Sequence, residues 1–154
     1  MKEIKEEIKR EIKETLTFFE AVDGTRFQDK EECRKYEDTA RCILRTRLKE
    51  LEVWRGNEWD LLKGCDDHDV IALQLQSQED VDTVMQAFLI DNPYYLKDGD
   101  ERTQKWLEER KDMAEKAYKE NDLLLMGLNC DDDLYFLDTR NGFIERLNNL
   151  DKKE

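Results

Sequence analysis

The sequence has few of the residues that build metal centres. It holds one histidine, His68, and four cysteines, Cys33, Cys42, Cys65 and Cys130, which lie far apart and form no C-x-x-C pair. Zinc sites use closely spaced Cys and His ligands, so this pattern argues against one. We expect reduced thiols and no cofactor, with Cys33 and Cys42 serving as small core residues of a helix.

Long apolar runs and catalytic signatures are also missing. The first sixteen residues alternate Lys and Glu with single Ile residues, whereas a secretory signal needs an unbroken apolar stretch. The sequence contains no G-x-x-x-x-G-K-[ST] loop, no G-x-S-x-G elbow and no H-E-x-x-H motif. We therefore expect a cytoplasmic protein that is not an enzyme.

Basic residues are scarce where acidic residues are dense. The formal net charge is −13, and residues 51–100 hold 3 basic against 12 acidic side chains. No Lys or Arg lies between Lys63 and Lys97, or between Asn121 and Thr139. Direct binding to nucleic acid or to an anionic membrane needs a basic face, so this composition argues against both.

The length of 154 residues fits one folded domain, preceded by a separate helix. Residues 1–16 place Ile4, Ile8, Ile12 and Leu16 at a spacing of four, which predicts an amphipathic helix. Its narrow apolar stripe either lies on the surface of its own domain or pairs with a second copy in a homodimer through Ile4, Ile8 and Ile12. Residues 17–154 then form a single α+β domain.

Local signals set the elements of this domain. Asp23-Gly24 predicts a hairpin turn, Asp29 and Ser77 are helix N-caps, and Pro93 ends a helix. Trp54 to Gly64 is predicted as a connection. We expect helices over about 30–52, 78–91, 101–120 and 139–150, and strands over 69–76, 123–128 and 134–137. Because strands and helices do not alternate strictly, we predict a small antiparallel or mixed sheet covered by about five helices.

Two segments carry a family resemblance. They read TFFEAVDGTRFQDKEECRKYE and DDDLYFLDTRNGFIERL, and their shared features are structural residues such as Gly24, Phe27, Cys33 and Tyr36. They cover about a quarter of the chain and resemble parts of small acidic proteins encoded by bacteriophages and prophages. The resemblance implies an accessory factor that blocks or redirects a host protein, as anti-CRISPR and other anti-defence proteins do. It implies no active site.

The leading functional hypothesis is an acidic surface that mimics nucleic acid. Carboxylates on a rigid fold can occupy the basic groove of a host defence protein or ribonucleoprotein complex. Aromatic residues in loops are frequent interface anchors. The same acids also suit helix N-termini, turns and a solvated face. The predicted partner-binding residues are Asp66, Asp67, Asp69, Glu79, Asp80, Asp82, Asp91, Tyr94, Tyr95, Asp131, Asp132 and Asp133.

Two alternatives remain at this stage. A metal-dependent enzyme acting on a nucleotide or nucleic acid would use Asp66, Asp67, His68 and Asp69, although no (D/E)-x-K pattern follows on the strand. An oligomeric scaffold or regulator would use the stripe of the first helix instead.

Overall fold

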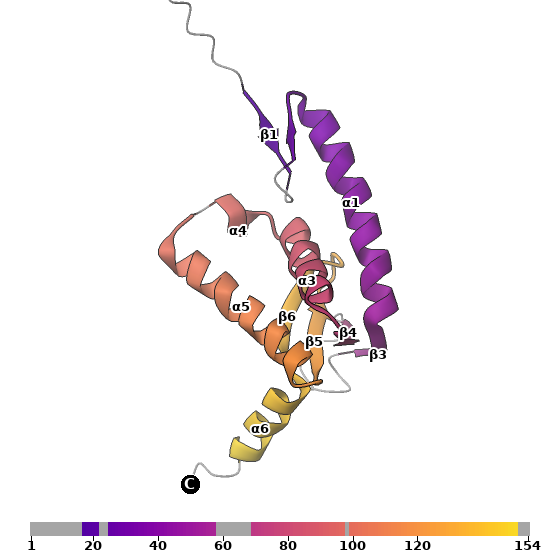
Figure 1. The fold of residues 1–154 in the computed structure, drawn as a ribbon, viewed down its shortest axis with the longest axis vertical. Helices are drawn as coiled ribbons and strands as arrows, with labels where there is room; N and C mark the ends of the chain where they lie inside the picture. Colours follow the sequence, from indigo (N-terminus) through magenta and orange to yellow (C-terminus); the bar gives the residue numbers. More distant parts are fainter. Residues whose placement is uncertain (1–16, 22–24, 58–68, 98, 151–154) are drawn as a thin grey trace, which may run out of the picture.

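A computed structural model describes residues 17–21, 25–57, 69–97 and 99–150. The elements in order are β1 (Phe19–Glu20), β2 (Arg26–Phe27), α1 (Lys30–Leu51), β3 (Glu52–Asn57), β4 (Asp69–Gln74), α3 (Gln78–Asp91), α4 (Tyr94–Lys97), α5 (Glu101–Lys119), β5 (Leu123–Leu128), β6 (Leu134–Thr139) and α6 (Arg140–Leu150). Figure 1 shows the short β1–β2 hairpin and α6 at opposite ends of the molecule, with the main sheet between them.

Four strands form one antiparallel sheet in the order β3-β4-β5-β6. Strands β4 and β5 pair along their full length, from Asp69 opposite Leu128 to Gln74 opposite Leu123. Strands β1 and β2 form a separate hairpin in which Phe19 pairs with Phe27. The predicted α+β class is therefore confirmed, and of the two predicted sheet types, antiparallel or mixed, the sheet is antiparallel.

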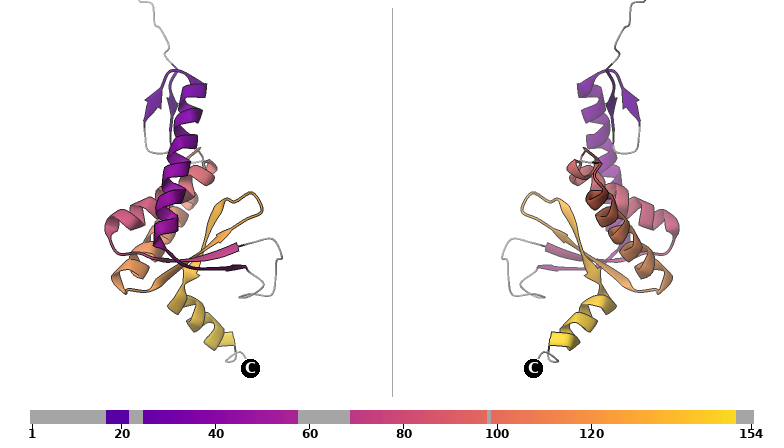
Figure 2. Two further views of the ribbon diagram at one scale, coloured as in Figure 1. Left: turned by 90° about the vertical axis from the view of Figure 1, so that its right-hand side faces the viewer. Right: turned by 90° about the vertical axis from the view of Figure 1, so that its left-hand side faces the viewer.

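The core lies between one face of this sheet and three helices. Residues of the central strands, such as Leu73 and Met126, are fully buried and form one cluster with Phe88 of α3 and Ala117 of α5. Leu48 near the end of α1 joins the same cluster. Burial of such side chains is the main favourable contribution to folding, so this face holds the sheet and the helices together. Figure 2 shows α1, α3 and α5 on the same side of the strands.

Side-chain oxygens cap α1, α3 and α5 at their N-termini. Asp29 accepts a hydrogen bond from the N–H of Glu32 at 2.9 Å, and Ser77 accepts one from the N–H of Asp80 at 3.2 Å. Both caps were predicted. Asp100 caps α5 in the same way, accepting from the N–H of Thr103 at 2.6 Å.

Predictions for one connecting segment and for one cysteine were wrong. The segment from Trp54, expected to be a connection, begins inside strand β3, which pairs with β4 and has an irregularity between Glu52 and Trp54. Cys42, expected in the core, is exposed, whereas Cys33 is buried. Cys33 and Leu48 are the buried residues of the 22-residue helix α1, so much of this helix remains in solvent.

Helix α6 follows β6 directly and buries none of its residues. Ile144, Leu147 and Leu150 are all exposed. The start of the helix is fixed instead by Asp122, whose buried carboxylate accepts a 2.9 Å hydrogen bond from the N–H of Asn141.

Candidate functional site

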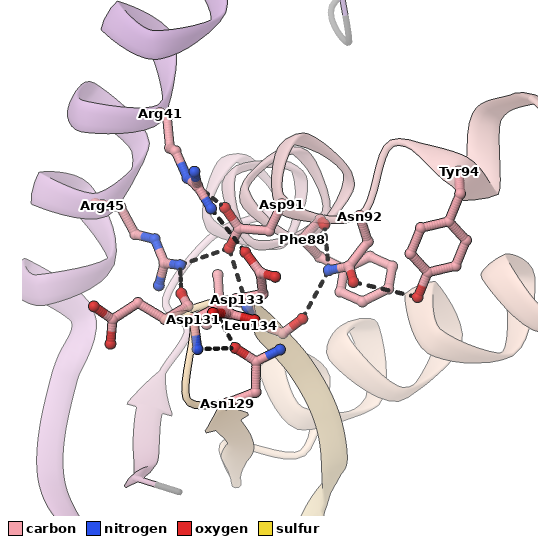
Figure 3. A network of polar contacts seen from close by, with 11 residues as sticks. Arg41, Arg45, Phe88, Asp91, Asn92, Tyr94, Asn129, Asp131, Asp133 and Leu134 are labelled. Atoms are coloured by element: carbon pink, nitrogen blue, oxygen red, sulfur yellow. Dashed lines mark hydrogen bonds and ion pairs between the residues drawn. The ribbon is translucent and has the colours of Figure 1, made fainter. Parts of the chain in front are cut away.

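The turn between β5 and β6 holds three predicted site residues in a fixed geometry. The Oδ1 of Asn129 accepts hydrogen bonds from the N–H groups of Asp131 and Asp133, each at 2.9 Å. The N–H of Asp132 donates to the carbonyl of Asn129 at 2.9 Å, and Asp132 itself has a φ of 61°. Asp131 and Asp132 are exposed at the tip. The turn therefore presents two carboxylates on a rigid support (Figure 3).

Asp91 lies behind this turn and is enclosed by the protein. Its side chain has no exposed area, and its Oδ1 accepts from Nε of Arg41 at 2.8 Å. Its Oδ2 accepts from Nη2 of Arg45 at 2.6 Å and from the N–H of Leu134 at 3.0 Å. Asp91 was predicted to contact a partner. It instead joins α1, α3 and the β5–β6 turn, because a buried carboxylate needs hydrogen-bond and ion-pair partners within the protein.

Arg41 and Arg45 lie one turn apart on α1 and link Asp91 to the turn (Figure 3). Nη2 of Arg41 donates to Asp133 at 2.8 Å, and Arg45 donates to the carbonyl oxygen of Asp132. Burial raises the pKa of Asp91 and lowers the pKa of Arg45, and the opposite charge of each partner acts against these shifts. The ion pairs thus offset part of the cost of placing these charges inside the fold, and burial remains the larger effect.

A third arginine comes from strand β3. Arg55 donates to both carboxylate oxygens of Glu52, at 2.9 and 2.8 Å, and to Asp69 at 3.2 Å. The hydrogen bond from Arg55 lowers the pKa of Glu52. Asp69, another predicted site residue, is therefore paired.

These groups surround a surface depression, which we call the Arg–Asp hollow. Its volume is about 480 Å³, and it is lined by Arg41, Arg45, Arg55, Leu128, Asp131 and Asp132. Carboxylates outnumber guanidinium groups when the lining of the hollow is counted together with the ion-pair partners of its arginines. The surface nevertheless carries charges of both signs, unlike the purely acidic surface that the sequence predicted.

The remaining acids of the first stretch lie elsewhere. Glu79 forms an ion pair with Arg47, and Asp80 accepts a 2.9 Å hydrogen bond from the N–H of Gln76. Asp82 is exposed. These residues lie in the first turns of α3, whereas Asp91 is its last residue, so roughly 14 Å or more of helix separates the two groups. The predicted acids do not form one patch.

The two tyrosines have different environments. The ring of Tyr95 stacks on Trp106, with centroids 4.5 Å apart and an interplanar angle of 4°, and it also lies 5.4 Å from the ring of Phe88. Tyr95 is therefore a packing residue. Tyr94 is 52% exposed, and its hydroxyl donates to Oδ1 of Asn92 at 3.3 Å, beside the β5–β6 turn (Figure 3).

Several predicted residues lie outside the described part of the chain. They are Asp66, Asp67 and His68 of the proposed metal cluster, and Ile4, Ile8 and Ile12 of the first helix. Within the described ranges, no three His, Cys, Asp or Glu side chains lie close enough together to hold a metal ion. No helix in the same ranges is long and apolar enough to cross a membrane.

The three arginines are the site residues that sequence reasoning missed. Their available signal was the spacing of Arg41 and Arg45, one helical turn apart beside the apolar positions of a long helix. Nothing local indicates that the partners of Arg41 and Arg45 lie 46 to 92 residues further along the chain.

Comparison of this chain with protein-family models, with curated proteins and with solved structures finds no match.

Proposed function

We propose that this protein acts by binding a partner protein through the Arg–Asp hollow, as an inhibitor or regulator rather than as an enzyme. The observation that carries the proposal is the rigid β5–β6 turn, which holds Asp131 and Asp132 in solvent beside three guanidinium groups. Binding needs surface groups that are exposed and already ordered, because ordering them on contact costs free energy. The four-stranded sheet and the helices on its face provide the rigid support.

The partner that fits best presents a basic surface. The carboxylate excess around the hollow attracts positive charge and speeds association, whereas the arginines add geometric specificity for acidic groups placed beside that charge. Arginine is also enriched among residues that dominate binding energy. A host protein that binds nucleic acid offers such a basic surface.

We therefore propose, more specifically, a phage-type inhibitor of a host nucleic-acid-binding defence protein, acting in the cytoplasm of the host cell. The resemblance of residues 17–37 and 131–147 to small phage proteins supports this context. The mode of binding differs from pure mimicry of nucleic acid, because arginines neutralise Asp69, Asp91 and Asp133.

No described contact favours the metal-dependent enzyme. Asp69 is the member of the proposed Asp66–Asp69 cluster that the structure describes, and its carboxylate is paired with Arg55. A guanidinium in that position competes with a cation for the same oxygens.

The test is recovery of bound protein from a host lysate by the intact chain and by two variants. Asp131→Asn with Asp132→Asn removes the exposed charges, and Asn tolerates the positive φ of position 132. Glu108→Gln with Glu109→Gln removes the same charge from the exposed side of α5. The proposal predicts a partner that is lost with the first variant, kept with the second and released by high salt. Equal recovery by both variants would contradict it.

A further inference from the structure

An apolar groove lies on the side of α1 next to the hairpin. It has a volume of about 180 Å³ and lies between α1, α3 and the residue that follows β1, with Ala21, Ala40, Ile43, Leu44 and Ile90 among its lining residues. Ile43 is 57% exposed although it lies in an ordered helix.

The α1 wall of the groove has the pattern of a helix-packing face. Tyr36, Ala40, Ile43 and Arg47 follow one another at spacings of four, three and four, which places them on one side of the helix. The small residue Ala40 lies in the middle of this row and leaves room for close approach. Ile90 of α3 forms part of the opposite wall. An apolar groove between two helices provides a packing surface for the apolar face of a third helix.

We propose that residues 2–16 of the same chain form a helix that docks into this groove antiparallel to α1. The sequence supplies the matching surface, since Ile4, Ile8, Ile12 and Leu16 recur every four residues. The segment is also connected close to the groove. Thr17 links it to β1, and Ala21, four residues after Thr17, lines the groove. One reversal of the chain near Thr17 turns the segment back along α1.

The two apolar rows have similar lengths. From Ile4 to Leu16 a helix rises by roughly 18 Å, and from Tyr36 to Arg47 it rises by about 16 Å. An antiparallel alignment that sets Leu16 beside Tyr36 therefore sets Ile4 beside Arg47. The same alignment brings Lys13 near Glu37, which lines the groove, so one pair of opposite charges meets at the rim.

Docking within one chain is favoured over pairing between copies. A covalent link of a few residues gives the docked segment a high effective concentration, on the order of millimolar. Two copies that each carry a net charge of −13 repel one another, which opposes a homodimer.

Methyl NMR of the full chain tests this proposal. It predicts nuclear Overhauser contacts between the Ile43 methyl group and those of Ile8 or Ile12, and their persistence when labelled protein is diluted into unlabelled protein. Ile8→Ser with Ile12→Ser should abolish the contacts and shift the Ile43 resonance. Glu6→Ser with Arg10→Ser, on the opposite side of the expected helix and without a net charge change, should preserve both.

Two results would overturn it. One is the lack of any contact between Ile43 and residues 4–16 in the intact protein. The other is a set of contacts that appears only between labelled and unlabelled copies, together with a dimeric mass in light scattering, which would assign the groove to a second copy.

Discussion

Arg45 and Asp91 lie on different helices, and Oδ2 of Asp91 accepts a 2.6 Å charge-assisted hydrogen bond from the Arg45 guanidinium. The carboxylate is enclosed, whereas the Arg45 side chain is 27% exposed. This pair places an arginine at the rim of the Arg–Asp hollow and ties α1 to the turn that carries Asp131 and Asp132. The proposed partner-binding surface therefore depends on contacts that also hold the fold together.

Removal of the buried carboxylate should destabilise the fold strongly. We expect Asp91→Ala to lower the free energy of unfolding by about 2–4 kcal/mol, because it leaves two guanidinium groups and the N–H of Leu134 without their acceptor. Urea unfolding followed by tryptophan fluorescence measures the change. Asp82→Ala, at an exposed position of the same helix, should alter stability by less than about 0.5 kcal/mol. Equal effects of the two changes would show that the Asp91 ion pairs contribute little.

A second prediction concerns the close contact of Gly127 with Tyr135. A Cβ atom at position 127 would lie 1.9 Å from Cζ of the Tyr135 ring, so the ring occupies the space that a side chain would need. We expect Gly127→Ala to cost about 1–3 kcal/mol of stability. In a Tyr135→Ser background the same change should cost clearly less, because the obstructing ring is gone. An unchanged loss of stability in that background would show that the destabilisation arises in the backbone of β5 instead.

The pH dependence of stability should depend partly on Asp100. The hydrogen bond from the N–H of Thr103 lowers the pKa of this carboxyl below its ordinary value of 3.8. A carboxyl with a lower pKa in the native than in the unfolded chain stabilises the fold when ionised. That contribution is fully present above the unfolded pKa and is lost as the pH falls through the native value.

Asp100→Asn isolates this effect, because asparagine still caps the helix but does not titrate. Between neutral pH and about pH 3, the melting temperature of the variant should fall less than that of the unchanged protein. An identical fall for both proteins would show that the Asp100 carboxylate has no part in the acid sensitivity.

The sequence predicted the elements that carry strong local signals. Asp29 and Ser77 were recognised as caps because a side-chain oxygen before an amphipathic run is a local feature, and the strand over 123–128 has the predicted bounds. Strand β3 was missed, because Trp54 and Gly56 at the edge of a sheet do not alternate in the way that a half-buried strand does.

The candidate site was less predictable, because its electrostatics depend on contacts between distant segments. The acidic stretches were evident, but Arg41 and Asp91 are 50 positions apart in the sequence, and no spacing rule links them. Charge counts along the chain therefore overestimated the uncompensated negative surface. Asp131 and Asp132 stay exposed at the tip of the β5–β6 turn, beside the arginines of the hollow, because hydrogen bonds to Asn129 hold the turn in place.

The most direct test of the central claim is the affinity of the purified partner for three forms of the protein, measured by calorimetry at low and at high salt. We predict that Asp131→Asn with Asp132→Asn weakens binding by about tenfold or more at low salt, and that the deficit shrinks as salt screens the charges. Glu108→Gln with Glu109→Gln should bind like the unchanged protein. Equal affinity of all three forms at low salt would contradict a binding site at the Arg–Asp hollow.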